Sequence, residues 1–331
     1  MKVHFHAPSH VRSRMEDGTA QFWSPLARVV ERMGGEVVPR AYEERSHRTI
    51  DAGDGAIHVV NNGAIRQANV LNAGLAYVDG FWHLDPVGVL AVSSIGARRF
   101  DPEAVPIREA RTFFRRLRGR FVERRRSRYK QPRTGLRGAM PEGAVALFLQ
   151  GASHLTDRSR IYSTPDMIRS VARGTDRPVR VKAHPLRVDA EDVAAVEEMA
   201  GEGRDIAMIE GNVHDILTHC CASVSISSAC SFEGFLHRKP AVLFGRSDFA
   251  QNAVKVGALD GFGTALDEAL GRRWPHVGFV HWYLREQSLW VEDPAFENRL
   301  ERILADAGLR AVPDGVLAML AGNRRGDLPR P

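Results

Sequence analysis

Two apolar stretches in the second half of the chain end in side chains that can bind an anion. The stretch Pro178–Pro185 is typical of a buried strand and ends in His184-Pro185, while the strand that begins at Ala222 runs into Ser227-Ser228 and then a short helix. The free N–H groups and the dipole of a helix N-terminus favour negative charge. Parallel strands of one sheet would bring both ends to the same edge, so the pattern predicts a nucleotide-phosphate site.

The elements that position these residues indicate an α/β protein with two domains. A length of 331 residues suits two domains of about 150 residues each. Residues 1–100 alternate apolar strands with helical stretches, and the pattern restarts at Val145 after Gln131-Pro132 and Gly135. We expect domains over 1–138 and 139–285, followed by a helical segment over 286–331.

Within the first domain we expect a helix over 64–72 and strands over 75–78 and 89–92, besides strands near 2–6, 36–39 and 56–60. Within the second, strands are expected over 145–150, 179–183 and 205–209. A helix over 294–307 has the length and pattern to pack back on the first domain.

Composition limits the function. Hydrophobic content of 44% with 26% charged residues describes a globular protein. No apolar run reaches the roughly 20 residues of a membrane helix, and the N-terminus lacks the apolar core of a signal peptide. We therefore expect a cytoplasmic protein.

The positive charge is concentrated in one segment. Residues 111–138 hold twelve of the 46 Lys and Arg residues and one of the 40 Asp and Glu residues, which leaves 34 basic against 39 acidic residues elsewhere. The run over Arg115–Arg128 could touch an anionic membrane surface, which would make the protein peripheral at the inner face of the membrane, or it could be a solvated linker. No nucleic-acid partner is expected, since no DNA- or RNA-binding motif accompanies the arginines.

Several short motifs follow one another along nearly the whole chain. They are Asp79-Gly80-Phe81, Asp85-Pro86-Val87-Gly88 with Ser93-Ser94, Leu149-Gln150 with Asp157, Lys182-Ala183-His184-Pro185, Ser227-Ser228 running into Phe232-Glu233-Gly234-Phe235, Lys239 to Gly245, and Trp282-Tyr283-Leu284 with Gln287. In this order they resemble the bacterial retaining β-Kdo transferases of capsule-polysaccharide biosynthesis. The resemblance implies a GT-B fold, with two Rossmann-like domains facing a central cleft and a C-terminal helix crossing back to the first domain.

The same resemblance implies transfer of Kdo, or a related ulosonic acid, from a CMP-sugar to a glycan or glycolipid. The His-Pro and Ser-Ser pair is also similar to the CMP site of bacterial GT-B sialyltransferases, so an inverting CMP-sialic acid transferase stays open. A third reading is a non-catalytic assembly protein that binds glycan or membrane. No cofactor and no metal are expected, because the leaving group is a monophosphate and the chain lacks a paired-carboxylate motif.

Site roles follow from this reading. Asp157 is the candidate nucleophile for retention, since double displacement needs a carboxylate at the anomeric carbon. His184 would stabilise or protonate the leaving phosphate, and Asp79 would serve as base or acceptor ligand. The expected donor contacts are Gln150, Lys182, His184, Pro185, Asn212, His214, Ser227, Ser228 and Glu233.

Overall fold

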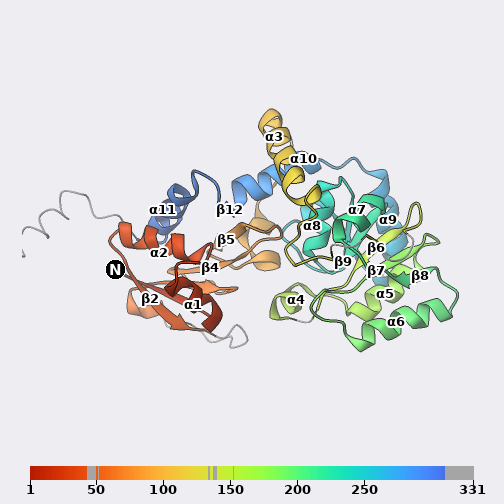
Figure 1. Ribbon diagram of the computed structural model, residues 1–331, viewed down its shortest axis with the longest axis horizontal. Coiled ribbons are helices and arrows are strands. Elements are labelled where there is room, and N and C mark those ends of the chain that lie inside the picture. The colour runs from red at the N-terminus through yellow and green to blue at the C-terminus, as the bar shows by residue number, and fades with distance from the viewer. Residues whose placement is uncertain (43–49, 51, 133–134, 137–139, 152, 310–331) are drawn as a thin grey trace, which may run out of the picture.

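The computed structural model describes residues 1–42, 50, 52–132, 135–136, 140–151 and 153–309. These residues form two lobes, each built on a six-stranded sheet with helices packed against it (Figure 1). The predicted α/β architecture is confirmed in both lobes, and the alternation of strands and helices departs from our expectation only after residue 61 of the N-terminal lobe. No helix among the described residues is long and apolar enough to cross a membrane.

The N-terminal sheet has the strand order β12-β5-β4-β3-β1-β2. The strands β1, β2, β3 and β4 run parallel to one another, whereas β5 is antiparallel to both β4 and β12. The strands are β1 (Lys2–Ala7), β2 (Glu36–Ala41), β3 (Ile57–Asn61), β4 (Val70–Leu75), β5 (Phe81–Asp85) and β12 (Leu289–Trp290). The helices that precede β2 are α1 (Ser9–Glu16) and α2 (Trp23–Arg32).

The chain between β3 and β5 differs from our expectation. No helix forms over 64–72 and no strand over 75–78; instead β4 pairs with β3 and turns into β5 at Asp79-Gly80, where Gly80 has φ +84°. The buried amide of Asn72 accepts from the backbone N of Ile65 and donates to the carbonyl O of Ile65, both at 3.0 Å. This tertiary pairing overrides the local helical pattern.

The expected strand over 89–92 is also wrong, because Leu90–Val92 forms a 3-10 turn. The carboxylate of Asp85 accepts from the backbone N–H groups of Val87, Gly88 and Ser94 at 2.8–3.1 Å. One buried carboxylate therefore closes this loop, and the Asp-Pro-Val-Gly motif is the loop itself.

The C-terminal sheet is parallel throughout and has the order β11-β10-β9-β6-β7-β8. The strands are β6 (Val145–Phe148), β7 (Val179–Lys182), β8 (Ile206–Met208), β9 (Ala222–Ser225), β10 (Ala241–Leu243) and β11 (Val254–Lys255). The helices are α4 (His154–Ser159), α5 (Thr164–Arg173), α6 (Ala190–Gly201), α7 (Val213–His219), α8 (Ala229–Leu236) and α9 (Phe262–Gly271). Parallel strands covered on both faces are apolar throughout, as the sequence of β6 predicts.

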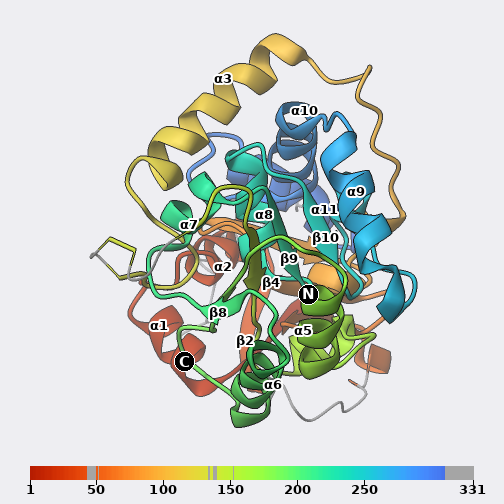
Figure 2. The same ribbon diagram turned by 90° about the vertical axis from the view of Figure 1, so that its right-hand side faces the viewer.

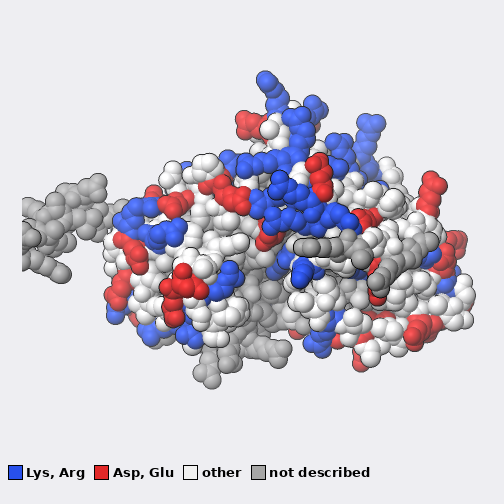
Figure 3. Space-filling view, in the orientation of Figure 1, with Lys and Arg blue, Asp and Glu red and all other residues white. Residues whose placement is uncertain are grey.

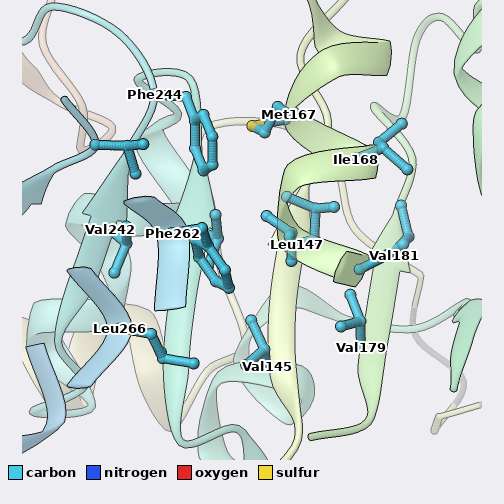
Figure 4. Packing of buried hydrophobic residues seen from close by; sticks show 14 of the residues in the cluster. Val145, Leu147, Met167, Ile168, Val179, Val181, Val242, Phe244, Phe262 and Leu266 are labelled. Carbon is cyan, nitrogen blue, oxygen red and sulfur yellow. The ribbon is translucent and has the colours of Figure 1, made fainter. Parts of the chain in front are cut away.

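Alternate residues of the central strands build the core of this lobe. Val145 and Leu147 of β6 and Val181 of β7 pack against Met167 of α5 and Phe262 of α9 (Figure 4). The neighbouring positions of β6 point to the other face and join a second cluster around α7. Because the sheet is held on both faces, the carboxyl ends of its strands are fixed in place.

A helix between the two sheets in sequence and the helices near the C-terminus connect the two lobes. Helix α3 (Ile107–Leu117) packs against α10 (His276–His281), and both lie along one side of the molecule (Figures 1 and 2). The chain then adds β12 to the N-terminal sheet, and α11 (Phe296–Asp306) packs on α2. The returning C-terminal helix that the sequence predicts is confirmed.

A buried polar contact also joins the lobes. Asp248 of the C-terminal lobe accepts from the hydroxyls of Ser93, at 2.6 Å, and Tyr283, at 2.8 Å. Ser93 therefore links the loop after β5 to the other lobe, while Ser94 donates to Asp85 within its own loop. The Ser93-Ser94 motif holds the two lobes in register.

Candidate functional site

A cavity of about 390 Å³ lies where the carboxyl ends of β6, β7 and β9 meet the N-terminal lobe. Six of the expected donor contacts line it: Gln150, Lys182, His184, Pro185, Ser227 and Ser228. Tyr77, Leu90 and Ala91 line it from the N-terminal lobe. The strand ends that the sequence singles out therefore converge on one pocket between the lobes.

Lys182 is the cation at the end of β7. Lys182 is only 9% exposed, and its side chain makes no hydrogen bond or ion pair with any described residue. Burial lowers the pKa of its ammonium group. Glu210 acts on the ammonium group only at a distance, so an enclosed cation without a direct ion pair favours an anionic ligand in the cavity.

His184 follows two residues later. Its Nδ1 accepts from the backbone N of Leu186 at 3.3 Å, so the ring proton of the neutral form is on Nε2. Burial, followed by the charges of Arg128 and Lys182, lowers the pKa of His184. At neutral pH the ring is thus uncharged and can donate a hydrogen bond through Nε2.

The backbone N–H groups of Ser227 and Ser228 have hydrogen-bond partners within the protein, which the sequence does not predict. The backbone N of Ser227 donates to Oε1 of Gln150 at 2.6 Å, and the backbone N of Ser228 donates to Oγ of Ser225 at 3.0 Å. Oγ of Ser228 accepts from the backbone N of Cys230 and caps α8. Two amides expected to be free already have partners, because side chains of neighbouring strand ends reach the turn.

Helix α4 forms one wall of the cavity. Ser153 caps it, and the cavity-lining residues Leu155, Thr156 and Ser159 share one side. Asp157 does not line the cavity: its side chain is 66% exposed, with Oδ1 4.0 Å from Nε of Arg160. The candidate nucleophile therefore lies on the same short helix as the wall, but on another face.

Residues 124–132, the arginine strap, pass over the cavity. Ser127, Arg128, Tyr129 and Gln131 all line it, and the ring of Tyr129 stands edge-on to His184 with 5.0 Å between centroids. None of these four residues is among the donor contacts that the sequence predicts. The signal that could have found them is the interruption of the basic run by Ser127, Tyr129 and Gln131.

Glu233 holds the arginine strap in place through hydrogen bonds. It is fully buried on α8 and accepts from Oγ of Ser127 at 2.7 Å and from the backbone N of Arg128 at 3.4 Å. Burial raises the pKa of Glu233 to about 7. Glu233 does not line the cavity; it holds the strap whose residues do.

Asn212 and His214 also contact the strap. Nδ2 of Asn212 donates to the carbonyl O of Arg125 at 3.0 Å, while its Oδ1 caps α7. Nε2 of His214 lies 2.6 Å from the carbonyl O of Arg126, and Nδ1 lies 2.9 Å from His237. The two residues lie outside the cavity lining, and a direct role in cytidine binding stays a prediction.

Asp79 occupies the β4–β5 turn and does not line the cavity either. Its carboxylate lies 3.7 Å from the guanidinium of Arg126, so it too contacts the strap. Its role as base or acceptor ligand stays a prediction.

The rest of the basic run divides into two parts. Arg118, Arg120 and Arg125 bind Leu236, Glu292 and Asp215 respectively and are used within the protein. Arg111 and Arg115 on α3 are exposed, and Lys and Arg side chains gather over this part of the surface (Figure 3). The expected membrane contact over Arg115–Arg128 stays a prediction. Within that run, the arginines of α3 are more exposed than Arg118, Arg120 and Arg125.

Comparisons with known proteins bear on the family resemblance and the fold. Residues 162–255, less than a third of the chain, match the model of a family described as capsule polysaccharide biosynthesis protein. Two solved structures from Thermosulfurimonas dismutans are similar over nearly the whole chain. The KpsC β-Kdo 2,7 transferase has 14% identity and a TM-score of 0.54, with 92% of this chain and 99% of that chain covered. The KpsC β-Kdo 2,4 transferase has 16% identity and a TM-score of 0.52, with 93% and 98% covered.

The chain has a GT-B fold. No curated protein matches the sequence. The resemblance to capsule-polysaccharide proteins that the motifs predict is confirmed for the C-terminal lobe, because the matched segment includes Lys182, His184 and Ser227-Ser228. At these identities the two KpsC structures establish the fold of this GT-B chain.

Proposed function

We propose that this protein is a glycosyltransferase of capsule or other surface polysaccharide biosynthesis that transfers Kdo, or a related ulosonic acid, from a CMP-sugar to a glycan or glycolipid acceptor. The observation that carries the proposal is the single cavity in which Lys182, His184 and Ser227-Ser228 meet between two GT-B lobes. The family match over 162–255 and the two Kdo transferases of similar fold support it.

The cavity offers complementary chemistry to the phosphate of such a donor. Arg128 and Lys182 supply positive charge, and the neutral ring of His184 supplies a hydrogen bond from Nε2. Donors fixed before the reaction stabilise the charge that grows on the leaving phosphate. A CMP leaving group carries one phosphate, so these groups can take the role that a metal ion has with diphosphate donors.

Asp157 fits the proposal if the sugar projects from the cavity toward the exposed side of α4. The anomeric carbon adjoins the phosphate and lies outside a cytidine subsite. An exposed carboxylate beside the cavity wall could then attack it and form a covalent intermediate, which gives retention. An inverting transferase would use the same donor cavity but would need only a general base.

The test is binding of CMP in a thermal unfolding assay. CMP at about 100 times its dissociation constant should raise the melting temperature by roughly 5 °C. His184→Ala removes a charge-assisted hydrogen bond and should weaken CMP binding by about 10- to 100-fold. His219→Ala, an exposed histidine at the end of α7, is the matched control and should keep the full shift.

The absence of a shift at millimolar CMP would overturn the donor assignment. A shift that survives His184→Ala unchanged would instead move the nucleotide away from the end of β7. A protein that binds vesicles or glycan but neither CMP nor a CMP-sugar would favour the non-catalytic reading.

A further inference from the structure

Three histidines of the N-terminal lobe meet on the face of the sheet opposite its hydrophobic core. His4 and His6 are two residues apart on β1 and share a face, and His58 on β3 is the register partner of His4. One ring nitrogen from each of the three lies within 4.8 Å of the others. His4 and His58 are 6% and 2% exposed, and His6 is half-buried, so the cluster lies mostly inside the lobe.

The spacing of the rings suits a shared ligand. Ring centroids are 5.1 Å apart for His4 and His58, 5.2 Å for His6 and His58, and 6.2 Å for His4 and His6. Three imidazoles around one tetrahedral ion, each at about 2.0–2.1 Å, place their centroids roughly 5 Å apart. The rings therefore need only small movements to surround an ion.

The hydrogen bonds of His58 are those of a metal ligand. Its Nε2 lies 3.1 Å from Oδ1 of Asp54, an acceptor when ionised, so the ring proton is on Nε2. Its Nδ1 then directs a lone pair toward Nε2 of His6 at 3.0 Å. Metal-bound histidines usually donate their second ring N–H to a carboxylate in this way, and Nε2 of His4 lies 3.9 Å from the other oxygen of Asp54.

We propose that His4, His6 and His58 bind a divalent transition metal ion of the zinc class, and that Asp54 orients the ligands. Imidazole nitrogens suit zinc, copper and nickel, and three of them leave a fourth position for water or an anion. This site is separate from the donor cavity, whose lining contains none of the three histidines. The proposal departs from our expectation, drawn from the sequence, that the protein binds no metal.

The site lies near the edge of the lobe that faces α4. His6 is the register partner of Val60, and two residues further on the carbonyl O of Asn62 accepts from Arg158 of α4 at 2.8 Å. Two strand residues span about 7 Å. A bound ion would therefore lie close to the cleft on the N-terminal side.

Arg40 competes with the metal. Its Nε donates to Nδ1 of His4 at 3.0 Å and occupies the lone pair that this nitrogen would offer to a metal ion. The Arg40 residue is exposed, so its side chain can turn into solvent when an ion binds. The proposal therefore makes an unusual prediction: removing Arg40 should strengthen metal binding.

The experiment titrates metal-stripped full-length protein with Zn²⁺ by calorimetry and with Co²⁺ by absorbance, without nucleotide. Wild type should bind one equivalent and give the visible spectrum of tetrahedral Co²⁺. His6→Ala and His58→Ala should lose this binding, Asp54→Asn should weaken it by about 10- to 100-fold, and Arg40→Ala should strengthen it severalfold. His10→Ala, an exposed histidine of α1, is the matched control and should bind as wild type does.

No stoichiometric uptake by wild type would overturn the proposal, as would equal uptake by His6→Ala and His58→Ala. Since a variant of a buried histidine can fail to fold, the surface variant Arg40→Ala provides an independent arm, and unchanged or weaker binding there would count against the site. The thermal shift with CMP serves as a fold control, because metal binding is measured without it and the two assignments can fail separately.

Discussion

At the scale of single residues, the positive charge and the imidazole hydrogen-bond donor of the site come from two different side chains. Lys182 supplies an unpaired ammonium group, whereas His184 is held neutral with its proton on Nε2. Asp157 is the one catalytic candidate whose side chain is mostly exposed. Its carboxylate is therefore accessible to a sugar that projects from the cavity along α4.

We expect Asp157→Asn to lower turnover by at least about 10³-fold while leaving the CMP thermal shift unchanged, because an amide cannot form the glycosyl intermediate. Asp176→Asn, an exposed aspartate before β7, is the control and should be fully active. Product configuration by NMR and mass spectrometry of a trapped adduct give the readout. An inverted product, or an active Asp157→Asn enzyme, would contradict the nucleophile role and favour the inverting transferase.

At the scale of elements, the arginine strap depends on side chains far away in the sequence. Glu233 of α8 holds Ser127 and Arg128, and the start of α7 holds the preceding carbonyl groups through Asn212 and His214. The strap in turn places Arg128 and Tyr129 on the cavity. The sequence predicts that Asn212, His214 and Glu233 contact the donor. In the structure they instead position the arginine strap, which covers the donor cavity.

Glu233→Ala should release the strap, because Ser127 and the backbone N of Arg128 lose their acceptor. We expect CMP affinity to fall by about 10-fold, the cost of one or two hydrogen bonds, and trypsin to cut more rapidly at the strap arginines. Glu197→Ala on the exposed face of α6 should change neither measurement. Unchanged proteolysis in Glu233→Ala would contradict the anchoring role.

At the scale of the whole molecule, Asp248 couples the lobes. Burial raises its pKa to about 7 even though Ser93 and Tyr283 donate to Oδ2, and Oδ1 has no partner among the described residues. A pKa raised above the unfolded value means that the folded state binds more protons between about pH 4 and 7. The stability that protonation gives is present below the unfolded pKa and is lost as the pH rises through this range.

Asp248 should therefore contribute a decrease in the free energy of unfolding of at most about 1.4 kcal/mol per pH unit from pH 5 to pH 7. Buried histidines with lowered pKa values, such as His83 and His276, contribute in the opposite direction. Asp248→Asn stays neutral, so the difference in unfolding free energy between wild type and Asp248→Asn should fall from pH 5 to pH 7, whereas Glu233 and the histidines contribute equally to both proteins. Urea unfolding at several pH values measures both proteins. Parallel pH profiles for the two would show that Asp248 does not carry the effect.

The sequence by itself determined the order of strands and helices outside residues 62–92, the returning C-terminal helix and the cavity residues at the ends of β6, β7 and β9. These follow from patterns within a few residues: the strand period, the Ser-Ser cap and the His-Pro stop. Only the tertiary structure decided that Asn212, His214 and Glu233 turn toward the strap, that the strap lines the cavity, and that His4, His6 and His58 meet. Those contacts join segments from about 50 to more than 100 residues apart, and no local pattern specifies which distant surface a polar side chain will face.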